Sequence, residues 1–328
     1  MTVRLGSIGL GWWGNELAAA ATRSGRAQVV TCFAPPPAER AAFVEKHSCG
    51  EVDNLDDLLS DPEIDGVLIA TPHSTHADLI VQAAEAGKHV YTEKPFTLTV
   101  AEADRAIAAC AAAGTVLQVG HNRRRLPANR TIKAMMDRGE LGEILFFEAV
   151  HSFPIIFKEE LGWRSNPKEL PAGGMTNLGI HQVDSFHYLT GPVARVSAFS
   201  KRLFATGEID DTTSINFEFE SGALGHLLTC TASGPVIDLI VHGTEGSAFN
   251  LDDGERLLLS RRGSSDRVEA ELEPLDTVVD ELTEFAAAIR GDGVPEVGGA
   301  EGREVIAVLE ATVASIERGR PVEVDEFR

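Results

Sequence analysis

Residues 3–14, VRLGSIGLGWWG, join a short apolar strand pattern to three glycines spaced as G-x-G-x-x-G. An Ala-rich helical pattern, residues 16–25, follows the glycines directly. In this context Gly9 permits a tight turn, Gly11 lets the backbone approach a pyrophosphate, and Gly14 lets helix and strand pack closely. The segment therefore predicts a βα unit that binds a dinucleotide, with its diphosphate on the N–H groups of the helix N-terminus.

The first 120 residues alternate β-branched runs with helical patterns. Strands that alternate with helices predict right-handed crossovers and a parallel sheet with helices on both faces. Glycines 25, 87 and 114 stand where three of the helices are expected to end. We expect a doubly wound Rossmann domain over residues 1–120. Its further strand patterns lie at 28–33, 66–71, 89–94 and 115–120, and its further helical patterns at 37–47, 76–87 and 100–114.

Residues 121–328 carry a different pattern, which predicts an α+β domain with a large, mostly antiparallel open sheet. Ser221-Gly222 and Asp253-Gly254 are typical of hairpin turns. An open antiparallel sheet can expose one face or dimerise through it. The predicted elements are helices at 127–138, 177–189, 276–290 and 299–318, a strand at 143–153, an irregular stretch at 154–175, and strand-rich segments between 193 and 262.

The overall composition is acidic, yet apolar enough to bury large cores. The 328 residues include 29 Lys and Arg against 50 Asp and Glu, a net charge of −21, with 43% hydrophobic residues. This charge disfavours nucleic acid and membranes as partners, because phosphate backbones need basic faces. No apolar run reaches about 18 residues, no signal peptide is apparent and the four cysteines are scattered, so we expect a cytoplasmic protein with reduced thiols.

The charge is unevenly distributed along the chain. Residues 266–328 hold 17 acids and 6 arginines, a net of −11, whereas residues 121–133, HNRRRLPANRTIK, hold five cations and no acid. Because the basic stretch follows the sixth strand, we expect it to form a basic wall of the ligand site. In that wall Arg124 could clamp a substrate carboxylate in bidentate fashion. The alternative is that these arginines pair with acids of the protein itself.

The end of the second strand pattern bears on which nicotinamide cofactor is bound. An NAD-binding unit normally carries Asp or Glu there for the ribose hydroxyls, but this chain reads Phe33-Ala34-Pro35, and the next arginine is Arg40. Phe33 or the prolines are expected to pack on the adenine instead. The expected cofactor is therefore NAD or NADP, with NAD favoured because no basic residue lies close enough to hold a 2′-phosphate.

Lys94, in Glu93-Lys94-Pro95, follows the fifth strand pattern. Ligands of open parallel sheets bind beyond the carboxyl ends of the strands, so we expect Lys94 to face the cofactor. Its ammonium could hydrogen-bond a substrate oxygen and hold partial negative charge there. A solvated loop lysine is the alternative.

The predicted helix at 177–189 carries a second set of acid–base candidates. Asn177, His181 and Asp184 stand at i, i+4 and i+7 and share one face of an α-helix. A nearby carboxylate would orient the imidazole, which could take a hydroxyl proton; a satisfied core histidine is the alternative. His187 falls off this face, so no metal site is expected.

Four motifs, taken in order, resemble one known family. They are GLGWWG at 9–14, Ala70-Thr71-Pro72 with His76, Glu93-Lys94-Pro95, and GGMTNLGIHQVD at 173–184. Over nearly the whole chain the sequence resembles the glucose–fructose oxidoreductase, inositol dehydrogenase and rhizopine-catabolism (Gfo/Idh/MocA) family. The resemblance implies NAD(P)-dependent oxidation of a secondary alcohol on a sugar, cyclitol or related polyhydroxylated ring. It also implies a homodimer or homotetramer formed through the C-terminal sheet.

The resemblance further implies roles for individual residues. Lys94 would contact substrate and nicotinamide, and His181 would act as acid and base. Asn177 stands where inositol-dehydrogenase-like members carry Asp, so it can orient groups but cannot accept a proton. The full cofactor set is Gly9, Gly11, Trp12, Trp13, Gly14, Phe33, Ala34, Thr71, Pro72, His73, His76, Glu93, Lys94 and Asn122, and the substrate set is Lys94, Arg124, Trp163, Arg164, Asn177 and His181.

Other functions stay open at this point. GLGWWG followed by Asn15-Glu16 resembles members that oxidise cis-dihydrodiols of aromatic acids. A non-catalytic regulator that senses NAD(P) is the alternative from another class, although it would not need Lys94 and His181. An oxidoreductase with a tightly held cofactor is a third.

Overall fold

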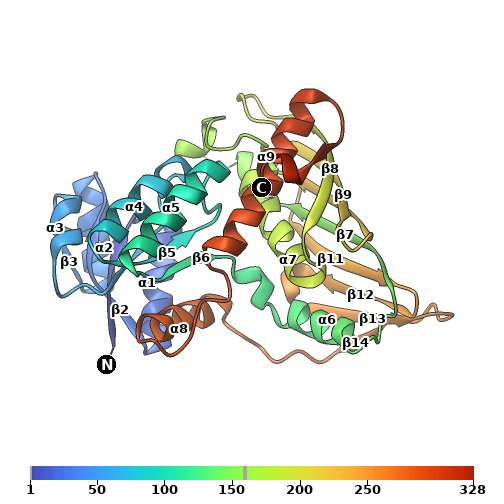
Figure 1. Cartoon of the computed structure of the whole chain (residues 1–328), viewed down its shortest axis with the longest axis horizontal. Coiled ribbons are helices and arrows are strands. Elements are labelled where there is room, and N and C mark those ends of the chain that lie inside the picture. The colour runs from blue at the N-terminus through green and yellow to red at the C-terminus, as the bar shows by residue number, and fades with distance from the viewer. Residues whose placement is uncertain (1, 158–160) are drawn as a thin grey trace. The chain divides into compact units, whose positions relative to one another are not determined.

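The alternating segment forms a six-stranded, all-parallel sheet in the order β3-β2-β1-β4-β5-β6. This order is that of the dinucleotide-binding fold, in which successive strands are added outward from β1 on one side and then from β4 on the other. The computed structural model describes residues 2–157 and 161–328 and confirms the predicted fold class (Figure 1). The strands are β1 Val3–Ile8, β2 Ala27–Phe33, β3 Gly50–Glu51, β4 Gly66–Ile69, β5 His89–Glu93 and β6 Leu117–Gly120.

Helices connect these strands and begin and end where the sequence indicates. Gly25 and Gly114 end their helices in the left-handed conformation, as predicted, and Thr99 with Glu102 forms a capping box at the start of α5. The short elements β3 and α3 were not predicted. The helices are α1 Trp12–Ser24, α2 Pro37–His47, α3 Leu55–Ser60, α4 His76–Glu85 and α5 Val100–Ala113, with the short 3-10 helix η1 at His73–Thr75.

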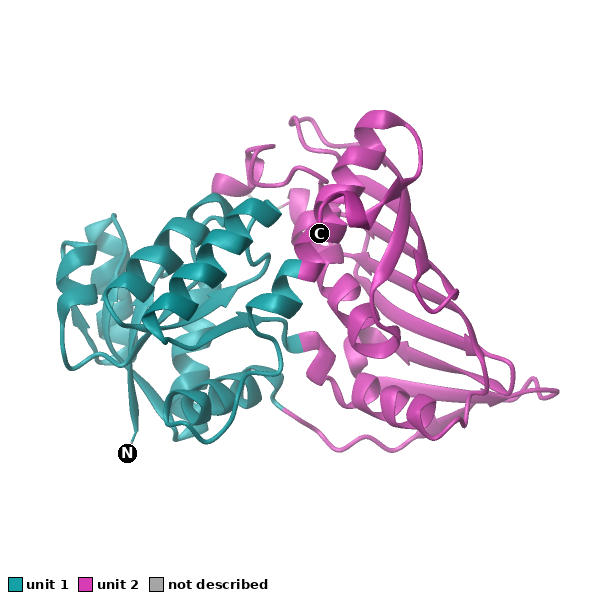
Figure 2. Ribbon diagram, viewed as in Figure 1, with its two compact units in different colours: residues 1–122, 276–303 teal, residues 123–275, 304–328 magenta. Residues whose placement is uncertain are grey.

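The helix α8, Thr277–Ile289, completes the core of this sheet although it lies far along the chain. Leu282 and Phe285 share one buried cluster with Leu17 of α1, and the Phe285 ring lies 5.9 Å from that of Tyr91. Contacts accordingly divide the chain into unit 1, residues 1–122 and 276–303, and unit 2, residues 123–275 and 304–328 (Figure 2).

Unit 2 contains a nine-stranded sheet in the order β14-β13-β12-β11-β7-β10-β9-β8-β15. Only β7 and β10 pair in parallel, so the sheet is mostly antiparallel as predicted. The strands are β7 Ile144–Ser152, β8 Val193–Lys201, β9 Thr212–Phe219, β10 Leu224–Cys230, β11 Val236–Gly243, β12 Gly246–Leu251, β13 Arg256–Arg261, β14 Val268–Ala270 and β15 Val322–Glu323.

Helices cover one face of this sheet (Figure 1). They are α6 Pro127–Asp137, α7 Ile180–Thr190 and α9 Gly299–Arg318. Phe186 of α7 packs edge-on against Phe147, Phe217 and Phe219 of the sheet, with ring centroids 5.6–5.7 Å apart. Burying such aromatic side chains contributes much of the stability of a core.

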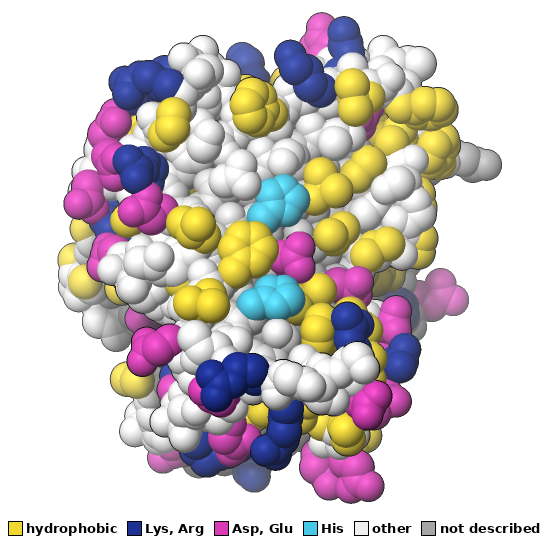
Figure 3. Space-filling view, turned by 90° about the vertical axis from the view of Figure 1, so that its right-hand side faces the viewer, with side chains coloured by type: hydrophobic (Ala, Val, Ile, Leu, Met, Phe, Trp, Pro, Cys, Tyr) yellow, Lys and Arg dark blue, Asp and Glu magenta, His cyan; other side chains and the backbone are white. Residues whose placement is uncertain are grey.

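Alternate residues of the same strands lie on the opposite face, which no helix among the described residues of unit 2 covers. Phe199 and Leu224 are 69% and 52% exposed there, and Phe146 and Ile240 are half-buried. Hydrophobic side chains and two histidines gather on this side (Figure 3). No helix among the described residues is long and apolar enough to cross a membrane.

Candidate active site

The glycine motif has the geometry that its sequence predicts. Gly9 adopts φ +90, and a Cβ on it would lie 2.4 Å from the carbonyl oxygen of Ala70. A Cβ on Gly14 would lie 2.1 Å from the carbonyl oxygen of Gly9, so both positions exclude larger residues. Around Gly11, by contrast, a Cβ would meet nothing within 4 Å. The turn is therefore packed on its inner side and open at Gly11.

The N-terminus of α1 fits an anionic ligand. Gly11 is the N-cap and has no side chain to accept a hydrogen bond from the first turn. The Asn15 amide donates to the carbonyl oxygens of Leu10 and Gly11 at 2.9 and 3.0 Å and so holds the turn in place. Uncapped N–H groups at the positive end of a helix form a ready anion site. Trp12, 78% exposed, and the half-buried Trp13 follow this turn.

At the end of β2, Arg40 stabilises the loop that follows the half-buried Phe33. Its guanidinium donates to the carbonyl oxygens of Ala34 and Pro35 at 2.9 and 3.2 Å. It also pairs with Asp53 and lies 3.3 Å from Glu51. Arg40, the first arginine after β2 in the sequence, thus already has two carboxylate partners.

The loops after β4 and β5 are tied together by a buried histidine. The Nδ1 of His76 lies 2.9 Å from the Pro95 oxygen and the Nε2 lies 3.1 Å from the Thr71 oxygen. The His73 ring lies 6.0 Å from that of His76, and Pro72 precedes it. The His76 imidazole therefore connects the loop after β4 with the loop that carries Lys94.

Glu93 ends β5 as a buried carboxyl group, and Lys94 follows it half-buried. Burial raises the pKa of Glu93 to about 7, against the opposing effect of the Lys94 charge. Asn122, after β6, donates to the Thr277 hydroxyl at 3.1 Å. The cofactor residues predicted at the ends of β1, β4, β5 and β6 are all at the carboxyl edge of this sheet, where such folds bind ligands.

In unit 2 the predicted helix at 177–189 begins with a π-helical turn, Met175–Gly179, and becomes α-helical at Ile180. A Cβ on Gly179 would lie 2.7 Å from the Thr229 side chain, so glycine lets this turn pack closely on β10. Asn177 thus lies in the π-helical turn and His181 in the α-helix, so the predicted i, i+4 face includes a turn of wider repeat than an α-helix. Such turns recur at functional sites.

His181 is only 8% exposed, and its ring stacks beside that of His151 at 5.9 Å with an interplanar angle of 23°. His151, on β7, was not predicted as a site residue. The strand's alternation could have identified it, because His151 shares the inward face with Phe147 and Ala149. The structure thus brings two imidazoles together near the π-turn.

Asp184 and Arg124, predicted for catalysis and for substrate binding, bind each other. The Arg124 Nε and Nη2 donate to the two Asp184 carboxylate oxygens at 3.0 and 2.5 Å. Asp184 is fully buried and Arg124 is 5% exposed. The Arg124 guanidinium therefore has a carboxylate partner inside the protein.

Three other cations of the 121–133 stretch, Arg123, Arg130 and Lys133, also have partners within the protein, so the expectation that the stretch forms a basic wall of the ligand site is corrected for them. Arg123 pairs with Asp253, and burial lowers its pKa to about 10. Arg130 donates to the Tyr188 hydroxyl at 2.9 Å, and Lys133 pairs with Asp137. The alternative stated above, pairing within the protein, describes these side chains better.

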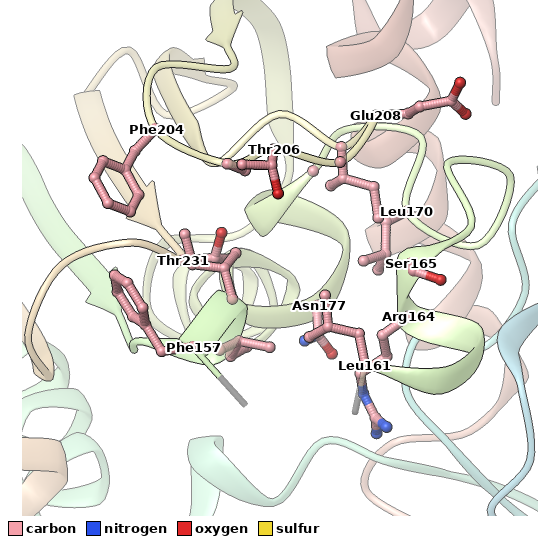
Figure 4. A pocket seen from close by; sticks show the side chains of 16 residues that line it. Phe157, Leu161, Arg164, Ser165, Leu170, Asn177, Phe204, Thr206, Glu208 and Thr231 are labelled. Atoms are coloured by element: carbon pink, nitrogen blue, oxygen red, sulfur yellow. The ribbon is translucent and has the colours of Figure 1, made fainter. Parts of the chain in front are cut away.

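A cavity of about 270 Å³ opens beside the π-turn (Figure 4). In the view, the Asn177 amide and the Arg164 guanidinium both point downward, and Phe157 and Phe204 lie at the left. Arg164 stacks on Trp163 at 4.2 Å, and burial lowers its pKa. No carboxylate of the described residues pairs with it. The apolar lining comprises Ile155, Ile156, Phe157, Leu161, Leu170, Phe204 and Ile209.

One wall of this cavity depends on Asp211, which sequence reasoning missed. Its carboxylate accepts hydrogen bonds from the backbone N–H groups of Leu203, Phe204 and Ala205 at 2.7–3.2 Å. Burial works against the charge, but these bonds outweigh it and lower the pKa of Asp211.

No group of three His, Cys, Asp or Glu in the described part of the chain could hold a metal ion.

Comparison with known proteins gives one consistent family. Residues 3–121 match the model of the oxidoreductase family with an NAD-binding Rossmann fold, and residues 129–249 match the GFO/IDH/MocA C-terminal domain. The scyllo-inositol 2-dehydrogenase (NAD(+)) of Bacillus subtilis is 32% identical, over 99% of this chain and 97% of its own. The 1,5-anhydro-D-fructose reductase of Ensifer adhaerens is 25% identical, over 98% of each.

Solved structures agree with this assignment. A putative NADPH-dependent oxidoreductase from Desulfitobacterium hafniense has a TM-score of 0.95 at 32% identity, over 100% of this chain and 99% of that one. Levoglucosan dehydrogenase in complex with NADH and levoglucosan has a TM-score of 0.91 at 23% identity, over 99% of this chain and 100% of that one. At this identity the similarity shows a shared fold. The chain belongs to the Gfo/Idh/MocA family, a family of NAD(P)-dependent, sugar/inositol dehydrogenase-like oxidoreductases.

Proposed function

We propose that this protein is an NAD(P)-dependent dehydrogenase that oxidises a secondary alcohol on a sugar, cyclitol or related polyhydroxylated ring. The observation that carries the proposal is the uncapped N-terminus of α1 behind a turn that is open at Gly11. Relatives whose names specify inositol and sugar substrates support the substrate class. When bound, the nicotinamide ring would accept the hydride that leaves the substrate carbon.

The roles of individual side chains follow from their chemistry. The N–H groups of Trp12, Trp13 and Gly14 would bind the diphosphate. Lys94 would polarise the substrate oxygen, and His181 would take the hydroxyl proton. Asn177, which cannot take a proton, would orient the substrate from the cavity side. The stacked His151 is a further group that can hold or pass a proton beside His181.

NAD is the cofactor that the β2 loop favours. A 2′-phosphate needs a cation with free hydrogen-bonding capacity, usually an arginine near this loop. Arg40 is 6% exposed, and its guanidinium is already engaged by Glu51, Asp53 and two carbonyl oxygens. The test is a pair of binding titrations, in which we expect NAD to bind more tightly than NADP.

A cis-dihydrodiol of an aromatic acid is a second candidate substrate, favoured by the cavity. A fully hydroxylated ring would place polar groups against the apolar wall, and each buried unsatisfied hydroxyl costs about 1–3 kcal/mol. A ring with an unsubstituted face avoids this cost, and its carboxylate would be attracted to the desolvated Arg164. The two candidates are separated by comparing kcat/KM for polyols and sugars with kcat/KM for cis-dihydrodiols of aromatic acids.

The decisive experiment measures cofactor reduction over that substrate panel with His181→Asn and a control, His187→Asn, on the same helix. We expect His181→Asn to lose about a hundredfold or more in kcat. Full activity of His181→Asn on every accepted substrate would refute the assigned role. Cofactor binding with no turnover of any substrate would favour the sensing regulator instead.

For the assembly, we propose that a second copy of the chain covers the exposed face of the nine-stranded sheet, to give a homodimer or homotetramer. Its exposed apolar residues, Phe199 and Leu224 among them, support this. Light scattering compares the mass of Phe199→Glu with that of the wild type. If the wild type is an oligomer and Phe199→Glu has the same mass, the proposal is contradicted.

A further inference from the structure

Three side chains of α2 share its inner face. Arg40, Phe43 and His47 stand at i, i+3 and i+7, a spacing that places them on one side of an α-helix. Phe43 is 2% exposed and belongs to the core of unit 1, and its ring centroid lies 4.4 Å from that of His47. Phe43 therefore anchors the helix, and one polar side chain lies on each side of it along this face.

The imidazole of His47 contacts the side chain that holds the glycine turn, residues 9–14. Its Nε2 lies 2.9 Å from the Asn15 Oδ1. The Asn15 Nδ2 donates to the carbonyl oxygens of Leu10 and Gly11, so the amide nitrogen faces the turn and the amide oxygen faces His47. Because an amide oxygen only accepts hydrogen bonds, the Nε2 of His47 must carry the hydrogen.

This contact selects one neutral form of His47. An imidazole carries a hydrogen on Nε2 in one of its two neutral tautomers and in the charged form. Burial lowers the pKa of His47, and the charge of the neighbouring Lys46 lowers it further, so the neutral form prevails at neutral pH. We therefore expect a neutral His47 with its hydrogen on Nε2.

Asn15 connects His47 with the backbone of the glycine turn. The Leu10 carbonyl shares a peptide plane with the Gly11 N–H, and the Gly11 carbonyl shares one with the Trp12 N–H. In a planar trans peptide the N–H points away from the carbonyl oxygen. Since both oxygens are held by Asn15, the N–H groups of Gly11 and Trp12 are directed away from that side chain. The N–H group of Trp12 is one of those assigned above to the diphosphate.

At the other end of the same helical face, Arg40 holds the loop after β2. Its guanidinium donates to the carbonyl oxygens of Ala34 and Pro35 at 2.9 and 3.2 Å. This loop is expected to contact the adenosine, and the glycine turn is expected to contact the diphosphate. One helix, anchored by Phe43, thus carries side chains that reach both segments of the proposed cofactor site.

We propose that α2 positions the dinucleotide site, with His47 directing the N–H groups of the glycine turn toward the diphosphate through Asn15, while Arg40 holds the adenosine loop. The inference rests on the cofactor site proposed above. His47 is a positioning residue, because it acts through Asn15 and needs no contact with the cofactor. Its loss should therefore weaken every ligand that contains the diphosphate, with or without a nicotinamide ring.

A matched pair of substitutions, His47→Gln and His47→Met, tests the donor alone. The two new side chains are similar in size, but only Gln has an N–H group that can donate to Asn15. Calorimetric titrations of the whole protein with NAD and with ADP-ribose measure the result. We expect His47→Met to weaken both ligands by the same factor, about three- to tenfold, and His47→Gln to bind nearly as the wild type does. On any substrate that is turned over, His47→Met should raise the KM for NAD and leave kcat unchanged.

Lys88→Met is the control for a general loss of stability in unit 1. The Lys88 ammonium donates to the carbonyl oxygens of Asp61 and Ile64 at 2.6 and 2.8 Å, before β4 and at the amino edge of the same sheet. Its replacement should lower the Tm and leave the affinity for NAD and ADP-ribose unchanged. Wild-type affinity in His47→Met, or equal weakening in His47→Gln and His47→Met, would overturn the proposal.

Nitrogen-15 NMR of the wild-type imidazoles provides a second measurement if His47→Met does not fold. A neutral His47 with its hydrogen on Nε2 would support the proposal, and a hydrogen on Nδ1 would overturn it. A wild type that binds neither NAD nor NADP would instead refute the proposed function.

Discussion

Replacing Asp184 by Asn should destabilise the protein far more than it should alter the chemistry of His181. The substitution keeps the shape but removes the charge that faces two nitrogens of the buried Arg124, at 3.0 and 2.5 Å. Breaking a buried ion pair by removing one partner costs about 3–5 kcal/mol. For a folding unit of this size each kcal/mol lowers the Tm by about 2–4 °C, so the expected loss is roughly 6–20 °C.

Thermal and urea unfolding of three variants and the wild type tests this reasoning. The double variant Arg124→Met/Asp184→Leu should recover much of the loss, because it leaves no buried charge behind. The control Asp78→Asn breaks an ion pair with Arg105 in which both side chains are exposed. It should lower the free energy of unfolding by less than about 1 kcal/mol. A Tm of Asp184→Asn within a few degrees of wild type, together with a collapse of kcat, would refute the structural role. It would instead favour the predicted pairing of Asp184 with His181.

Three further predictions follow from individual contacts. Gly14→Ala should unfold or lose cofactor binding, because its Cβ would lie 2.1 Å from the Gly9 oxygen. Gly11→Ala, whose Cβ would meet nothing within 4 Å, should fold normally and bind NAD more weakly. Melting curves and NAD titrations compare the two variants. The ionised Asp211 stabilises the wild type at neutral pH, and this stabilisation is lost as the pH falls through the lowered pKa of Asp211. Asp211→Asn should therefore have a lower Tm than the wild type at neutral pH and a similar Tm in acid. Because the pKa of Glu93 is raised, its contribution to the free energy of unfolding is present below about pH 4.5 and is lost as the pH rises to about 7. In Glu93→Gln the stability should therefore fall less steeply over this pH range than in the wild type. Equal slopes of stability against pH for the two proteins would contradict this prediction.

Most of the fold could be predicted from the sequence because its signals are local. Alternating strands and helices, and the glycines at positions 25 and 114, set elements that the structure confirms to within a few residues. The elements β3 and α3, of two and six residues, are too short to show a period. The packing of α8 with α1 could not be predicted, because it joins residues more than 250 positions apart and depends on tertiary contacts alone.

The candidate site was only partly predictable, since several side chains act through partners distant in the sequence. The π-turn at Met175–Gly179 arises where glycine meets Thr229, and no helical periodicity in the sequence reveals it. Sequence spacing suggested Asp184 as a neighbour of His181, yet its charge is matched by Arg124, 60 residues away. His151, in contrast, could have been found, because strand alternation places it with the core residues of β7.

Local charge counts describe this protein poorly, because pairing decides which charges a ligand can meet. The stretch 121–133 is the most basic in the sequence, yet Arg123 and Arg124 each pair with a carboxylate of unit 2. Arg164 is a single arginine in an irregular segment, yet it lines a cavity, is desolvated and pairs with no carboxylate of the described residues. A desolvated cation that lines a cavity attracts an anion entering that cavity more strongly than cations that are already neutralised by carboxylates. If the substrate carries an acid group, Arg164 is therefore the side chain that should select it, and Arg164→Met should reduce kcat/KM for acidic rings more than for neutral ones.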